Sequence, residues 1–183
     1  MTKTIYEEYG NYFLGKFKND KMLKFDIVRN DGCMFCVYIF TEKCNFDYFI
    51  RVDKEGFYID GCVEQDEGIE CEDIAKEDKA YIIAELDKHA NIFQTFLKNG
   101  LFIYCYKNAK LSMSCSIVIQ DRKKYLKELK IEEVYKSCKD NRDLPFEEID
   151  HIELRDFYND VYYTYDKAST QRIANSKVAN SNQ

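Results

Sequence analysis

The spacing of hydrophobic positions changes along the chain, and each change predicts a different element. Near the N-terminus apolar residues recur every four positions, which predicts a helix over 4–17. From residue 22 apolar and polar residues alternate, and Asn30-Asp31-Gly32 supplies a hairpin turn. Beyond this turn, residues 33–41 are apolar on both faces, which predicts a central strand covered on both sides. Two further strands are expected at about 46–53 and 57–63, and together the four strands form an antiparallel meander.

The second half of the chain mixes both periods. A long apolar stripe predicts a helix over 79–99, and the alternation of residues 111–119 predicts one strand of a later hairpin. A charged helix over about 121–138 follows, and Pro145 opens a final helix at about 146–165. The predicted fold is α+β, with a four-strand meander and a later hairpin packed against about four helices.

No stretch rich in glycine or proline interrupts this pattern, so we expect one domain over 1–166. Residues 167–183 are polar and contain three basic residues and no acidic ones, which predicts a flexible, weakly basic tail. The net charge of the whole chain is −6, so residues 1–166 carry −9. A body with this charge repels phosphate backbones, and we expect no non-specific nucleic-acid binding by it.

The N-terminus lacks the pattern of a signal peptide, and the longest apolar run, 33–40, is too short to span a bilayer. Both features predict a cytoplasmic protein without membrane contact. The eight cysteines are then expected to be free thiols in a reducing compartment.

Acidic residues gather in two regions. The segment 64–78 holds eight carboxylates and one lysine, and their mutual repulsion opposes folding. The predicted final helix carries further acids on one exposed edge. Two interpretations are open: simple solvated faces, or a surface on which carboxylates stand in for phosphates and occupy a basic groove. Under the second, the partner-binding residues are Glu64, Asp66, Glu67, Glu70, Glu72, Asp73, Glu153, Asp156 and Asp160.

Recognisable catalytic motifs are absent from the sequence. Cys33 and Cys36 have the spacing of a redox or zinc pair, but a strand directs their sulfurs to opposite faces. Glu148 and His151 form only half of a di-iron pattern. We therefore predict no catalytic residue, no metal and no cofactor, and a protein that binds more readily than it catalyses. The alternatives are a metal-dependent nuclease or hydrolase using surface carboxylates, and a scaffold that assembles through the tyrosines of the final helix.

In its compact size, its acidity and its two groups of acids, the chain resembles small inhibitors from phages and other mobile elements, such as anti-CRISPR and toxin-immunity proteins. The resemblance implies an inhibitor that blocks a cationic nucleic-acid-handling enzyme through an acidic surface. The expected partner is a nuclease or a nuclease–RNA complex, such as a CRISPR effector nuclease or a toxin nuclease.

Overall fold

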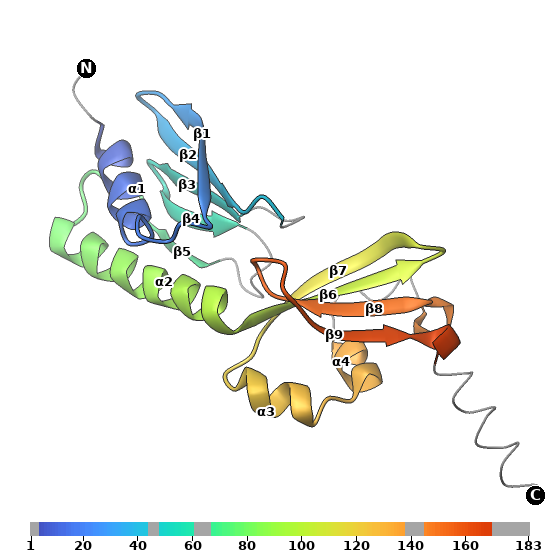
Figure 1. The fold of residues 1–183 in the computed structure, drawn as a ribbon. Helices are drawn as coiled ribbons and strands as arrows, with labels where there is room; N and C mark the ends of the chain where they lie inside the picture. Colours follow the sequence, from blue (N-terminus) through green and yellow to red (C-terminus); the bar gives the residue numbers. More distant parts are fainter. Residues whose placement is uncertain (1–3, 44–47, 61–66, 138–144, 170–183) are drawn as a thin grey trace, which may run out of the picture. The chain divides into compact units, whose positions relative to one another are not determined.

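The computed structural model describes residues 4–43, 48–60, 67–137 and 145–169 (Figure 1). Contacts within the chain divide it into two compact units, 1–98 and 99–183. The described residues form one antiparallel sheet of five strands and another of four, together with α-helices and a short 3-10 helix. The predicted α+β class is confirmed, and the later hairpin belongs to the second sheet.

The first unit is the predicted meander with one more strand. Its sheet has the order β1-β2-β3-β4-β5, and every neighbouring pair is antiparallel. The fifth strand lies inside the acidic segment, outside the predicted strands. The elements are α1 (Ile5–Gly15), β1 (Lys24–Asn30), β2 (Met34–Phe40), β3 (Tyr48–Asp53), β4 (Gly56–Asp60), β5 (Glu67–Glu70) and α2 (Lys79–Asn99).

Aromatic side chains from the two helices and the sheet form the core of this unit. The Phe13 side chain of α1 is fully buried, with its ring centroid 5.0 Å from that of Phe57 on β4. Phe93 of α2 meets Tyr48 of β3 edge-on, with centroids 4.8 Å apart. Such rings each bury a large apolar area, so both helices are held to one face of the sheet.

Two glycines permit close approaches in this unit. A Cβ added at Gly10 of α1 would lie 2.2 Å from Cδ1 of Phe35, so the helix can rest directly on that ring. Gly56 opens β4 with a φ of 146°, and a Cβ there would lie 1.7 Å from the carbonyl oxygen of Ile69 on β5. Only glycine adopts this conformation and leaves this space.

The second unit has the strand order β7-β6-β8-β9, again antiparallel throughout. Two helices lie on one side of this sheet (Figure 1). Its elements are β6 (Gly100–Lys107), β7 (Lys110–Val118), α3 (Arg122–Lys127), α4 (Ile131–Ser137), the 3-10 helix η2 (Phe146–Glu148), β8 (His151–Arg155) and β9 (Val161–Asp166).

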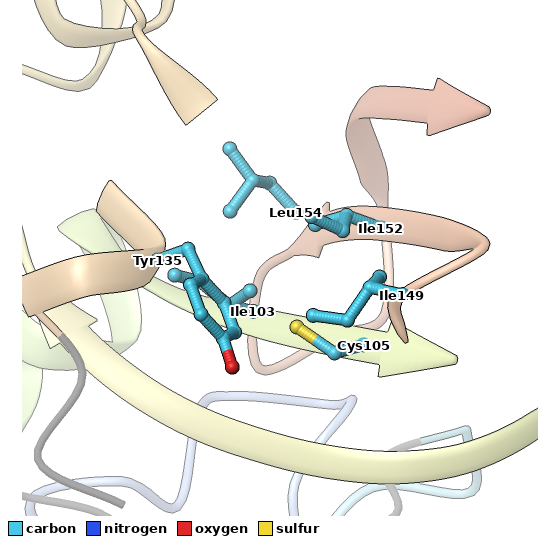
Figure 2. Packing of buried hydrophobic residues seen from close by; sticks show 6 residues of the cluster. All are labelled: Ile103, Cys105, Tyr135, Ile149, Ile152 and Leu154. Carbon is cyan, nitrogen blue, oxygen red and sulfur yellow. The ribbon is translucent and has the colours of Figure 1, made fainter. Parts of the chain in front are cut away.

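A small apolar cluster forms the core of this unit, as Figure 2 shows. β6 and β8 each contribute alternate residues, and Tyr135 of α4 closes the cluster with 3% of its surface exposed. The buried members are Ile103, Cys105, Tyr135, Ile149, Ile152 and Leu154.

Two helix predictions in this unit are wrong. The helix expected over 146–165 is replaced by η2 and the hairpin of β8 and β9, because Ile152 and Leu154 alternate with polar residues and enter the core as strand residues do. The helix expected over 121–138 is instead two helices, α3 and α4. Glu128 caps the first of them.

None of the described helices has the length and apolar character to cross a membrane. Of the predicted flexible tail, residues 170–183 lie outside the described residues.

Candidate functional site

The acidic segment is anchored to the first sheet. Glu64 and Asp66 lie outside the described residues, and Glu67 is the first residue of β5. Beyond β5, two backbone N–H groups donate to carbonyls of the β3–β4 turn: Cys71 to Glu55 at 2.9 Å and Ile74 to Lys54 at 2.9 Å. The Ile74 side chain is fully buried. From residue 67 onward this segment therefore has a fixed course.

Some of its acids serve the local structure. The Asp73 carboxylate accepts from the backbone N–H of Ala75 at 3.2 Å and pairs with Lys76 at 3.1 Å. The hydrogen bond from Lys76 holds the pKa of Asp73 below its usual value. Asp78 precedes α2, and its Oδ1 accepts from the N–H groups of Ala80 and Tyr81 at 2.7 and 3.1 Å. This is the geometry of a helix N-cap.

Three further acids of the segment face solvent. Glu70, Glu72 and Glu77 are exposed, and within the described ranges none of them forms an ion pair. We call these three residues the free acids. They stand on a segment held at both ends, by the β4–β5 pairing and by the start of α2. Their negative charge is therefore presented on an ordered backbone.

The second predicted group of acids does not form an exposed helical edge. Glu153 lies on β8, where its Oε1 meets His151 Nε2 at 2.8 Å and its Oε2 accepts from Arg155 Nε at 2.5 Å. Burial raises the pKa of Glu153, but the hydrogen bonds from His151 and Arg155 outweigh burial and leave it below its usual value. The negative charge of Glu153 is thus balanced by hydrogen-bond partners on the same strand, His151 and Arg155.

Asp156 is buried and held by several polar groups. Its Oδ1 accepts from the backbone N–H of Asp160 at 3.0 Å, and its Oδ2 accepts from the Tyr162 hydroxyl at 2.9 Å. Arg122 approaches to 3.6 Å and stacks over the Tyr162 ring at 4.7 Å. Asp160 alone of this group is exposed. The helix on which these acids were expected is absent, because residues 156–160 form the turn between two strands.

The two acidic groups belong to different units of the chain. Charge neutralisation of Glu153 and burial of Asp156 remove two of the expected partner-binding side chains from an open surface. The acids that match the expectation best are therefore those of the first unit.

Both histidines are embedded in structure. His89 is buried in α2, with its ring centroid 6.0 Å from that of Phe57. His151 is on a strand, and Glu148 binds Lys107, so the predicted helical Glu–His pair does not form. In the described part of the chain, no three His, Cys, Asp or Glu side chains come together as metal ligands.

The cysteine pair lies partly outside the strand on which it was expected, since β2 begins at Met34. Cys33 is exposed in the β1–β2 turn, whereas Cys36 is buried on β2. Burial raises the pKa of the Cys36 thiol and so disfavours the reactive thiolate.

Sequence reasoning missed a row of side chains on the sheet face of the first unit that points away from the helices. Arg51 of β3 lies 4.3 Å above the Tyr58 ring and pairs with Asp53 at 3.0 Å. Nearby on the same face, Tyr38 and Phe49 have ring centroids 5.1 Å apart. Strand alternation places these residues on one face, but only the register shows that they meet.

The first unit offers exposed carboxylates beside its sheet and half-exposed aromatic rings on one sheet face, which suits binding to another macromolecule. Comparison with protein-family models, with curated proteins and with solved structures finds no match for this chain.

Proposed function

We propose that this protein is a protein-binding inhibitor. It blocks a cationic nucleic-acid-handling enzyme, such as a CRISPR effector nuclease or a toxin nuclease, by placing the free acids Glu70, Glu72 and Glu77 in a groove that normally receives phosphates. The observation that carries the proposal is that these carboxylates are exposed and without ion pairs among the described residues, on an ordered backbone.

The order of the segment supports this function because a flexible acidic loop loses conformational freedom when it binds. Here the buried Ile74 and the backbone bonds to residues 54 and 55 fix the course of the chain beforehand. A preorganised surface retains more of its interaction energy as affinity.

Long-range charge supports it as well. Residues 1–166 carry a net charge of −9, which attracts a basic enzyme and speeds their encounter. Such an interaction weakens as salt screens the charges, with a screening length of about 10 Å at 0.1 M.

The test begins with capture of the partner by the tagged full-length protein from a host lysate, at about 50 mM and about 500 mM salt. The captured nuclease is then purified and its cleavage of nucleic acid is measured with added inhibitor. The decisive variant is E70K/E72K/E77K. We expect it to lose inhibition by at least about a hundredfold in concentration, since each unfavourable contact in the groove costs about 1 kcal/mol or more.

The matched control is E128K/E132K/E133K, which makes the same charge change at exposed positions of the second unit. Inhibition should survive in this control at low salt. Equal loss in both variants would show that net charge alone matters, and equal retention would refute the role of the free acids. Cleavage by the protein itself, stopped by EDTA, would favour the alternative of a metal-dependent nuclease.

A further inference from the structure

Strand β1 is the most exposed strand of the first sheet. It lies at the edge of the sheet, and among the described strands only β2 pairs with it. Every residue of β1 is exposed. The outward N–H and C=O groups of an edge strand are a template for another strand.

Apolar side chains follow this edge on one face. Phe25 and Ile27 stand opposite Ile39 and Val37 of β2, so they share the face that carries the core. Ile39 and Val37 are fully buried, whereas Phe25 is 37% exposed and Ile27 is 53% exposed. The core face of the sheet thus continues onto β1 without being covered there.

The opposite face of the edge is charged. Asp26 stands opposite Tyr38, and Lys24 lies two residues before it on the same face. Lys24 approaches Glu42 at 3.5 Å, but both side chains are largely exposed, so this pair is weak. A bulge at Val28 interrupts the register, so the regular part of this edge before the bulge is Lys24–Ile27.

Two copies of this edge can pair in an antiparallel sense about a two-fold axis. Along an edge strand, the backbone N–H and C=O groups of every second residue point outward. Two residues that face each other across the dimer must either both point these groups toward the other copy or both point them away. The axis must therefore pass through a residue that faces itself. A two-fold axis through Lys24 would place two lysines face to face, and an axis through Asp26 would place two aspartates face to face.

With the axis through Phe25, the facing residues are compatible on both faces of the sheet. Lys24 of each copy then faces Asp26 of the other, so the charged face gains two opposite-charge pairs. On the apolar face, Phe25 meets its own symmetry mate, and Ile27 of each copy lies opposite the position of Leu23, an apolar residue buried just before β1. Of the centres available before the bulge, this one alone matches charge with charge and apolar with apolar.

We infer that this protein forms a two-fold symmetric homodimer through β1, with Phe25 on the axis, which joins the two five-stranded sheets into one continuous sheet. The short stretch makes this a reversible dimer, with a dissociation constant on the order of micromolar, as is usual for small interfaces. The inference is independent of the proposed inhibitory function.

The first test measures molar mass of the full-length protein by sedimentation over about 1 to 100 μM, a range that brackets such a constant. We expect K24E and D26K each to weaken the dimer by about tenfold or more, because each turns both opposite-charge pairs into like-charge pairs. The double variant K24E/D26K restores the opposite pairs and should recover the dimer. K88E, at an exposed position of α2, is the charge control and should dimerise normally.

The second test fixes the register. In a C33S background, F25C should cross-link the two copies under mild oxidation, since directly opposed residues lie within disulfide reach. D26C should cross-link far less, because this register offsets the two copies of residue 26. A protein that stays monomeric throughout the concentration range would overturn the inference. So would a dimer that ignores both charge reversals, or one that cross-links through D26C and not through F25C.

Discussion

Gly10 and Gly15 lie in the same helix but in different surroundings. A Cβ at Gly10 would collide with the buried Phe35 ring, whereas no atom lies within 4 Å of the corresponding position at Gly15. The spacing of apolar residues predicts α1 but does not distinguish the two glycines. The structure shows that Gly10 has a packing role and that Gly15 has none in the described residues.

The two alanine variants should therefore differ in sign. We expect G15A to raise the free energy of unfolding by up to about 1 kcal/mol, because alanine is the better helix former. G10A should lower it by about 1–3 kcal/mol, because the Phe35 ring has no room to move in a packed core. Urea unfolding of both variants measures the difference. A gain in both would contradict the close approach of α1 to Phe35.

Glu153 gives a prediction about pH. Its pKa is lower in the folded protein than its ordinary value of 4.5, because the hydrogen bonds from His151 and Arg155 outweigh burial. The resulting stabilisation is present above about pH 4.5 and is lost as the pH falls through the folded-state pKa. E153Q should cost about 1–2 kcal/mol at pH 7, and the gap from the wild type should narrow below pH 4.5. A gap that stays constant down to pH 3 would argue against the ion pair.

At the level of elements, the sequence correctly predicts those helices and strands that the local spacing of apolar residues determines. The alternation that begins at residue 22, the apolar run over 33–41 and the stripe of α2 correctly predict β1, β2 and the helix. Residues 151–155 alternate as well, yet Glu153, Leu154 and Arg155 are good helix formers, and the helical stripe drawn through Leu154 conceals the strand. Pairing with β6 decides the outcome, and that contact joins distant parts of the chain.

In the candidate site too, the features set by local sequence can be predicted and those set by contacts between elements cannot. The Asp78 cap can be read from its place directly before a helix, and the acidity of 64–78 is plain. The loss of Asp156 and Glu153 as open charges cannot be read, because it depends on Arg122 from another element and on strand geometry.

The Asp78 cap predicts a difference between two substitutions that remove the same charge. D78A deletes both the charge and the acceptor for the N–H groups of Ala80 and Tyr81. D78N keeps an acceptor oxygen. We expect D78A to cost about 1 kcal/mol in unfolding free energy and D78N a few tenths, as is typical of N-caps. Thermal unfolding of the pair checks this, and equal losses would assign the effect to charge.

At the level of the whole molecule, the described residues form two sheets, each with its own buried residues. The expectation of one domain over 1–166 rests on the absence of a linker, and α2 does pass directly into β6 at residues 99 and 100. The absence of a linker does not by itself make two cores fold as one.

The self-contained aromatic core of the first unit leads us to predict that a fragment of residues 1–98 folds alone. It should unfold in a single cooperative transition and retain dispersed amide resonances, because α1, α2 and all five strands are included. Chemical denaturation and NMR of the fragment provide the measurement. A fragment that lacks a cooperative transition would support a single domain over 1–166 instead.

The contact at Gly56 also limits how the gene for this protein can change. Any codon change that gives residue 56 a side chain places a carbon where the Ile69 carbonyl already lies, at a φ that L residues rarely adopt. Such a mutation harms the attachment of β5 to β4, and with it the base from which the free acids project. Under the proposed function, selection at Glu70 and Glu72 therefore extends to the backbone position of Gly56. Gly32, in open space, is free of that constraint.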